Sequence, residues 1–190
     1  MSPSRGQQSL FANIKMSKLN KDQARAIKNA ADLDGLSMTD RKTLIKMIDN
    51  SVENDQAIKL FVDGAADLHS KTAGIGGVIY SNDKELSNFS EPLFDKTNNE
   101  AEYLALIKGV EKLVNLKVVT VDIYADSELV VKQVLGIYKV KNERMKILHN
   151  LVLEKLKLID QWNLVHIRRE KNIRADELSK LGMNKAKSEK

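Results

Sequence analysis

The sequence predicts an α/β domain with a mixed five-stranded sheet flanked by helices, preceded by a small helical N-terminal extension. Three strand patterns follow one another with only short turns between them, which favours an antiparallel meander. Two later strand patterns are separated by helical patterns, and crossovers of this kind favour parallel pairing. We therefore expect three antiparallel strands followed by parallel strands, in one domain over residues 56–183.

Composition bounds the protein class. With 190 residues, 42% hydrophobic and 30% charged, the chain is long enough for one well-cored globular domain and an appendage. It has no run of about 18 apolar residues and no signal-peptide pattern, so we expect no membrane span. The absence of cysteine excludes disulfides and thiolate metal sites and fits a cytoplasmic protein. A net charge of +5 is compatible with a polyanionic partner, and we expect a monomer.

The N-terminal extension is expected over residues 1–55. Its first 17 residues are polar and are expected to be mobile. Helical patterns follow over about 20–33 and 39–49, with Asn20 and Thr39 as N-caps, and the acidic stretch 51–56 is the linker candidate. The extension is too small for much core of its own. It could be a docking module for a protein partner, a second nucleic-acid contact or a stabilising appendage.

The first three strands are expected over 58–63, 73–81 and 85–93. The first is an apolar run that ends at Asp63, just before a glycine. Glycines within the second allow close backbone approach. Asn82 and Asp83 supply the turn to the third strand.

A long helix is expected over 99–116, because apolar residues recur there at the spacing of a core-facing stripe. Asn98 is the expected N-cap, and Glu102 lies in the first turn. A β-branched strand over 118–125 follows and ends at Asp126.

The last third of the chain begins with helical patterns over 127–135 and 145–159, joined by a basic connection over 139–142. A fifth strand over 162–168 leads to a final helix that begins at Asn172 and is expected to end at Gly182. The charged residues 184–190 are expected to be disordered.

Four carboxylates stand at the ends or beginnings of these elements: Asp63, Glu102, Asp126 and Asp176. Singly, each has a plain interpretation as a turn residue, a helix-dipole partner or a solvated first-turn acid. In an α/β sheet, however, strand ends and helix starts share one crevice, where carboxylates resist ionisation without cations. Oxygen ligands without His or Cys suit Mg²⁺ or Mn²⁺. Two such ions can activate a water and stabilise the leaving oxygen in phosphodiester cleavage.

Residues 58 to about 183 resemble a type 1 ribonuclease H. The matching stretches are F-V-D-G-A (61–65), G-I-G-G-V-I (74–79), T-N-N-E-A-E-Y-L-A-L (97–106), Y-A-D-S-E-L-V-V-K-Q (124–133) and R-E-K-N-I-R-A-D-E-L (169–178). The resemblance implies the ribonuclease H fold and endonucleolytic hydrolysis of the RNA strand of an RNA–DNA hybrid. It implies that the metal-binding catalytic acids are Asp63, Glu102, Asp126 and Asp176. It also implies hybrid contacts at Thr97, Asn98 and Asn99, where minor-groove contact can detect the 2′-hydroxyl of RNA. We expect further substrate contacts at Gly64 and phosphate contacts at Lys141 and Arg144.

The chain departs from the family pattern in three places. The short connection 139–142 replaces a basic protrusion, and residues 168–171 stand where some members carry a mobile-loop histidine. Residues 1–57 contain Phe11 as their one aromatic, so the hybrid-binding domain of other members is not carried over. Two rivals stay open. Proofreading-type exonucleases place a Glu where this chain has Ala65, and a non-cleaving binding protein would act through the extension.

Overall fold

The computed structural model describes residues 21–51 and 57–189. The chain divides into two compact units, residues 1–55 and 56–190. The mobile segment expected over 1–17 lies outside the described residues, as does the linker expected over 51–56 apart from Ser51. Within the described parts, no helix combines the length and the apolar character that a membrane crossing needs.

The first unit contains two helices, α1 (Lys21–Ala31) and α2 (Met38–Ser51). The N-cap of α2 is Ser37, whose Oγ accepts a hydrogen bond from the Asp40 amide at 3.1 Å and lies 2.7 Å from the Asp40 carboxylate. The prediction of Thr39 as the cap was therefore wrong. Thr39 is already inside the helix, because Ser37 satisfies the first-turn amide.

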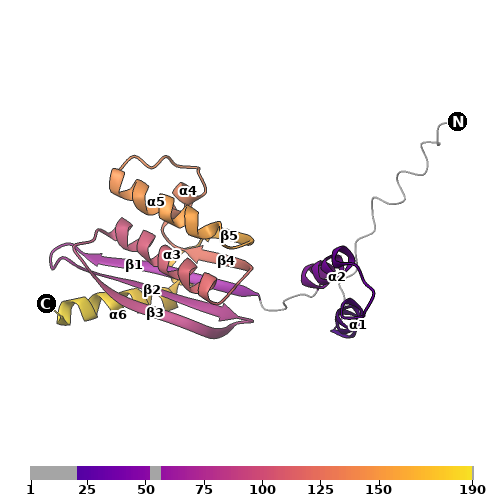
Figure 1. The fold of residues 1–190 in the computed structure, drawn as a ribbon. Helices are drawn as coiled ribbons and strands as arrows, with labels where there is room; N and C mark the ends of the chain where they lie inside the picture. Colours follow the sequence, from indigo (N-terminus) through magenta and orange to yellow (C-terminus); the bar gives the residue numbers. More distant parts are fainter. Residues whose placement is uncertain (1–20, 52–56, 190) are drawn as a thin grey trace. The chain divides into compact units, whose positions relative to one another are not determined.

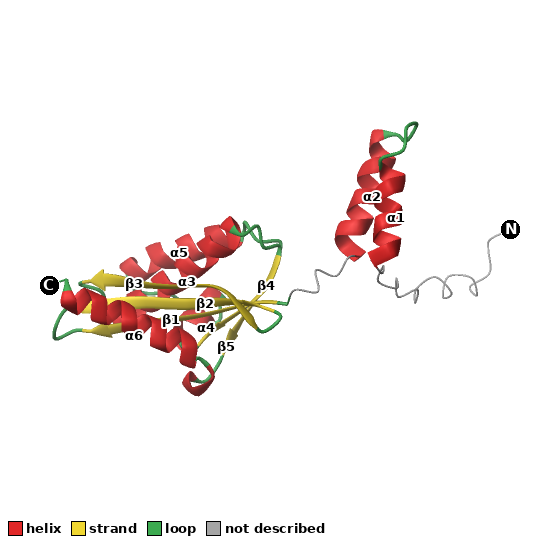
Figure 2. Ribbon diagram, turned by 90° about the horizontal axis from the view of Figure 1, so that it is seen from below, coloured by secondary structure: helices red, strands yellow, loops and turns green. Residues whose placement is uncertain are grey.

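The second unit is built on one sheet, drawn in Figures 1 and 2. Its strands are β1 (Ile58–Asp67), β2 (Thr72–Ser81), β3 (Lys84–Phe94), β4 (Thr120–Ala125) and β5 (Gln161–His166). They lie in the order β3-β2-β1-β4-β5. The first three pair antiparallel, and β4 pairs parallel with both β1 and β5. The predicted mixed five-stranded sheet is confirmed.

Helices cover the two faces of the sheet unequally. One face carries α3 (Asn98–Asn115), α4 (Glu128–Val134) and α5 (Glu143–Leu156), and the other carries α6 (Ile173–Ser188), as Figure 1 shows. A single 3₁₀ turn, η1 (Arg169–Lys171), leads into α6. The core lies between α3 and the sheet, where Leu60, Tyr103 and Leu106 have no exposed surface. Burial of such side chains supplies about 1.5–3 kcal/mol each, which holds α3 in place.

Asp63 does not end its strand as predicted. β1 continues to Asp67, which pairs with Thr72 of β2. The parallel pairing of β1 with β4, by contrast, ends at Val62 and Ala125. Asp63 and Asp126 are thus the first residues beyond that pair on two neighbouring strands, and this puts two acids side by side at one edge of the parallel half.

Gly182 does not end α6, and residues 184–188 are helical where a disordered tail was predicted. A Cβ on Gly182 would lie 2.5 Å from the carbonyl oxygen of Glu91 on β3. This glycine therefore permits a close helix–strand approach, and the helix continues past it. Beyond it, Lys187 pairs with Asp67 at 2.9 Å and ties the last turn of α6 to the end of β1.

Candidate active site

The start of α3 is fixed by a reciprocal pair of hydrogen bonds. The Glu100 amide donates to Thr97 Oγ1 at 3.3 Å, and the Thr97 amide donates to Glu100 Oε2 at 2.9 Å. This capping box makes Thr97 the N-cap, where Asn98 was predicted. Asn98 instead accepts a hydrogen bond from the Ala66 amide of β1 at 3.2 Å. Both interactions orient the helix start against the central strand, and with it Glu102.

Glu102 is buried against β1 and lies directly beside Gly64. Its Oε2 accepts a hydrogen bond from the Gly64 amide at 3.2 Å. A Cβ on Gly64 would lie 2.3 Å from the backbone of Ala101 and of Glu102. Only glycine lets the helix come this close to the strand. The predicted substrate contact of Gly64 stays a prediction, and close packing under α3 is the role that its surroundings show.

Three of the four predicted acids come together from three different elements. Asp63 of β1, Glu102 of α3 and Asp126 after β4 each offer a carboxylate oxygen, and these oxygens lie within 4.8 Å of one another. Asp63 and Glu102 are buried and Asp126 is half-buried. We call these three residues the acid cluster. Among the described residues, no lysine or arginine forms an ion pair with any of them.

The raised pKa values in the acid cluster show that its negative charge is energetically unfavourable. Burial, assisted by the charges of Asp63 and Asp126, raises the pKa of Glu102 to about 9. Burial also raises the pKa of Asp63 to about 7, against the opposing hydrogen bond from Ser179. Three crowded carboxylates without a counter-ion favour protonation or a bound cation. Because every donor is a carboxylate oxygen, the set fits a hard divalent cation such as Mg²⁺ or Mn²⁺.

Asp176, the fourth predicted acid, lies next to the cluster but is held by two cations. Arg169 Nε donates to its Oδ1 at 3.0 Å, and Lys180 Nζ lies 2.5 Å from its Oδ2. Burial works to raise the pKa of Asp176, but the ion pairs with Lys180 and Arg169 outweigh it and hold that pKa below its ordinary value. The charge of Asp176 still contributes to the raised pKa of Asp63. Its role as a metal ligand stays a prediction.

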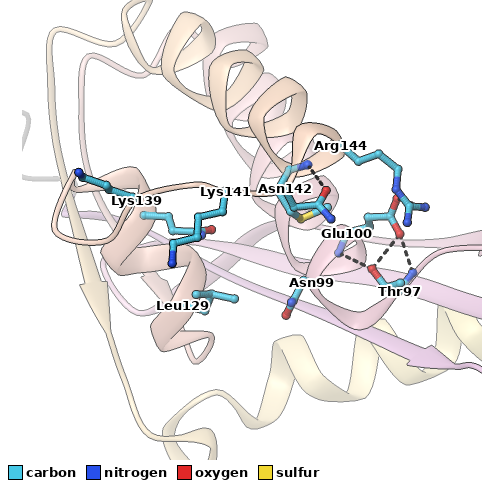
Figure 3. A pocket seen from close by; sticks show the side chains of 10 residues that line it. Thr97, Asn99, Glu100, Leu129, Lys139, Lys141, Asn142 and Arg144 are labelled. Carbon is cyan, nitrogen blue, oxygen red and sulfur yellow. Dashed lines mark hydrogen bonds and ion pairs between the residues drawn. The ribbon is translucent and has the colours of Figure 1, made fainter.

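A groove of about 440 Å³ lies between the first turn of α3 and the connection that leads into α5. We call it the α3–α5 groove, and Figure 3 shows the side chains that line it. Thr97 and Asn99 line one side, while Lys139, Lys141 and Arg144 line the other. Four of the six predicted substrate contacts therefore share one surface; Gly64 and Asn98 are not part of its lining.

The lining of the groove contains apolar as well as polar side chains, and one polar residue ties it to the core. Gln133 of α4 lines the groove and accepts a hydrogen bond from the buried Tyr103 hydroxyl at 2.8 Å. Arg144 lies 3.8 Å from Glu100, the acid of the capping box. The groove thus presents cations and amide groups beside the same helix turn that carries Glu102, an arrangement suited to a phosphate backbone.

Comparisons with known proteins point to one family. A family profile described as Reverse transcriptase-like matches residues 61–182. Ribonuclease HI of Halobacterium salinarum is 28% identical over 130 residues, which are 68% of this chain and 65% of that relative. The bifunctional protein Rv2228c of Mycobacterium tuberculosis is 30% identical over 129 residues, which are 65% of this chain and 35% of that relative. The chain thus spans less than two-thirds of the length of either curated relative.

Solved structures agree with the sequence comparison. The N-terminal RNase H domain of rv2228c from Mycobacterium tuberculosis superposes with a TM-score of 0.67 at 27% identity, over 70% of this chain and 98% of that one. LC11-RNase H1, solved in complex with an RNA/DNA hybrid, is 38% identical with a TM-score of 0.64, over 68% of this chain and 98% of that one. The chain belongs to the ribonuclease H family.

Two side chains that contact the acids in this member of the ribonuclease H family were not predicted from the sequence. Ser179 of α6 donates a hydrogen bond to Asp63 from a fully buried position. Lys180 pairs with Asp176, and its spacing of four residues along a helix was a usable signal. Arg169 belongs to the segment 168–171 that stands in place of a mobile-loop histidine, and the structure pairs it with Asp176. No local sequence pattern predicts the contact that Ser179 makes, since its partner Asp63 is 116 residues away.

Proposed function

We propose that this chain is a divalent-metal-dependent endonuclease that hydrolyses the RNA strand of RNA–DNA hybrids. The observation that carries the proposal is the acid cluster, in which Asp63, Glu102 and Asp126 bring carboxylate oxygens within 4.8 Å of one another. Such a cluster is costly to maintain in a folded protein unless a cation offsets its charge. A purely structural role would not explain three acids from three elements in one place.

The substrate class is supported by the α3–α5 groove and by family membership. The groove places Lys139, Lys141 and Arg144 opposite Thr97 and Asn99 on α3, two turns or less from Glu102. Basic side chains position a phosphate backbone, while small polar groups can reach sugar hydroxyls. LC11-RNase H1 was solved with an RNA/DNA hybrid, and we extend that substrate to this chain.

Each part of the site has a distinct task in the proposed reaction. Asp63, Glu102 and Asp126 would hold the metal, with Asp176 as a further ligand once its ion pairs with Arg169 and Lys180 are exchanged. We propose Mg²⁺ as the ion, Mn²⁺ as a substitute, and two ions with substrate bound. Bound metal supplies Lewis-acid stabilisation of the phosphate and makes water a nucleophile near neutral pH. The groove residues would hold the hybrid in register with the acids.

The function of residues 1–55 stays open between a docking module, a second nucleic-acid contact and a stabilising appendage. Deleting them and comparing the salt dependence of hybrid affinity tests the nucleic-acid role, because loss of a phosphate contact makes affinity fall less steeply with salt. The cytoplasmic location and the monomeric state also stay predictions.

The proposal is tested by incubating an end-labelled RNA–DNA hybrid with the protein in Mg²⁺ and in excess chelator. We expect internal cuts in the RNA strand with Mg²⁺ and none with chelator. Asp126→Asn is expected to lower cleavage by more than about 100-fold, the upper range for residues that only support metal ligands. Asp122→Asn is the matched control, because Asp122 is on the same strand and bonds to Asn163 outside the cluster.

Two outcomes would overturn the proposal. Wild-type protein that does not cleave the hybrid excludes a ribonuclease H activity on this substrate. Equal cleavage by the wild type and by Asp126→Asn removes the acid cluster from the reaction. Hybrid binding that is unaffected by chelator, with turnover no higher than a blank, would instead favour the non-cleaving binding protein.

A further inference from the structure

Helix α6 lies unusually close to β2, and this sets what can reach Asp63. A Cβ on Gly76 would lie 2.2 Å from the Ser179 amide nitrogen, and one on Gly74 would lie 2.3 Å from the Ser179 carbonyl oxygen. The backbone of Ser179 therefore rests directly on the strand. Since Gly76 is the pairing partner of Asp63 in the β1–β2 ladder, the same contact places Ser179 over Asp63.

The Ser179 side chain is fully buried, and its hydroxyl has two neighbours. It donates to Asp63 Oδ2, and it lies 2.9 Å from the main-chain carbonyl oxygen of Asp176 on the preceding turn. A hydroxyl has one hydrogen to donate, and a carboxylate is the stronger acceptor. A helical serine usually bonds to a carbonyl on the preceding turn, so its bond to Asp63 has to come from its position on the sheet.

The three other acids offer Asp63 no such support, and the charge of Asp126 raises the pKa of Asp63. Glu102 is held by the Gly64 amide, and Asp176 is held by Arg169 and Lys180. Among the described residues, Ser179 is the one whose side-chain hydroxyl donates a hydrogen bond to Asp63. One carboxylate oxygen of Asp63 is thereby hydrogen-bonded to α6, and its other carboxylate oxygen, which faces no such donor in the described parts of the chain, is available to the acid cluster.

We propose that Ser179 is a positioning residue that fixes the orientation of Asp63 for metal binding. The inference rests on the proposed function, because it assigns Asp63 to the metal. Hydrogen bonds of this kind orient ligating carboxylates, and their removal typically lowers metal affinity or activity by about 10–100-fold. Without the hydroxyl, Asp63 is free to turn toward α6 or toward Asp126, and the oxygens of the cluster are no longer preset.

The experiment measures Mn²⁺ binding by calorimetry on the full chain, for the wild type and for Ser179→Ala. Ser90→Ala is the matched control, because Ser90 Oγ donates to the Leu178 carbonyl at 2.8 Å in the same contact between α6 and the sheet and touches no acid. We expect Ser179→Ala to weaken Mn²⁺ binding about 10-fold or more, and Ser90→Ala to leave it unchanged. In cleavage assays, the Mg²⁺ concentration for half-maximal rate is expected to rise by a similar factor with KM for the hybrid unchanged.

Ser179→Cys provides a second variant with a larger atom and a weaker donor in place of the hydroxyl, and we expect an intermediate loss of Mn²⁺ affinity. Wild-type affinity in both Ser179 variants overturns the inference. So does an equal loss in Ser90→Ala, which would mean that only helix packing matters. A wild type that binds Mn²⁺ but cleaves no hybrid overturns the proposed function alone, because calorimetry still compares the variants. A wild type that binds no Mn²⁺ overturns both.

Discussion

Glu102 accepts a hydrogen bond from the amide of Gly64, the residue that follows Asp63 in β1. One backbone group thus couples the acid on α3 to the acid on the central strand. The contact exists because the glycine carries no side chain, so the geometry of the acid cluster depends on a residue that has no chemistry of its own. This dependence can be tested by adding a single methyl group.

Gly64→Ala is expected to destabilise the fold by about 3 kcal/mol or more, because the new Cβ would lie 2.3 Å from the backbone of α3. Mn²⁺ affinity should fall as well, since α3 has to move away from β1. Urea unfolding and calorimetry measure the two effects. Gly136→Ala is the control: its Cβ would meet nothing within 4 Å, and only its positive φ of 73° costs about 1–2 kcal/mol. A milder effect of Gly64→Ala than of Gly136→Ala would contradict the packing argument.

Stability of the metal-free protein is expected to fall as pH rises. The pKa of Asp63 is raised to about 7 and that of Glu102 to about 9, both above the values of 3.8 and 4.5 for unperturbed groups. The folded state therefore binds more protons than the unfolded chain between about pH 4 and 9, and the free energy of unfolding decreases across that window. Urea unfolding in chelator at several pH values measures this slope.

Glu102→Gln is expected to remove that slope between about pH 7 and 9 and to halve it roughly between about pH 4.5 and 7, because the amide does not titrate. Saturating Mn²⁺ should flatten the slope of the wild type, since the cation stabilises the ionised acids. Glu154→Gln, an exposed change on α5, is the control and should retain the wild-type slope. Parallel curves for the wild type and Glu102→Gln would show that burial of Glu102 does not govern the pH dependence.

Lys141→Ala is expected to raise KM for the hybrid several-fold with kcat little changed, because Lys141 lines the α3–α5 groove and no acid of the cluster contacts it. Loss of one phosphate contact should reduce the slope of log affinity against log salt by about 1. Lys157→Ala, at the opposite end of α5, tests whether net charge alone explains the effect. Identical salt slopes for the two variants would argue against a phosphate contact in the groove.

Tyr103→Phe is expected to destabilise the protein by about 1–2 kcal/mol. Both Tyr103 and Gln133 are buried, and the substitution leaves the Gln133 Oε1 atom without the 2.8 Å hydrogen bond it accepts. Because Gln133 lines the groove, KM for the hybrid should also rise. Tyr138→Phe, at an exposed hydroxyl, is expected to change stability by less than about 0.5 kcal/mol. Chemical unfolding of both variants decides whether the buried hydrogen bond between Tyr103 and Gln133 stabilises the protein beside the groove.

The order and type of the elements were predictable from hydrophobic periodicity, whereas several boundaries were not. Beyond Asp63 the chain reads G-A-A-D, which has little strand propensity, and it is kept extended by pairing with β2 and by amide hydrogen bonds to Glu102 and Asn98. Thr97, Asn98 and Asn99 are all residues that can cap a helix. A glutamate three residues later follows both Thr97 and Asn99, and the Ser/Thr preference of the capping box favours Thr97, so that signal is visible in the sequence.

Contacts between distant segments explain the other differences. Gly182 has the local pattern of a helix-ending glycine, but its position against β3 depends on how α6 lies on the sheet. The convergence of Asp63, Glu102 and Asp126 was predicted from expected strand ends and a helix start, and it holds although Asp63 lies inside β1, because the parallel pairing with β4 ends just before it. The ion pair of Asp176 with Lys180 follows from a four-residue spacing within α6, whereas the pair with Arg169 depends on how η1 meets α6, which strand and helix patterns do not specify.

The extension of β1 past its parallel partner has a consequence for how the protein loses activity on heating. Residues on either side of Asp63 remain in the ladder with β2 up to Asp67, in the central strand of the sheet. Amide protons in core strands are among the slowest to exchange with solvent, because their opening free energies approach that of the whole domain. Mn²⁺ affinity and global structure are therefore expected to disappear at the same temperature, so that no inactive but folded state precedes melting.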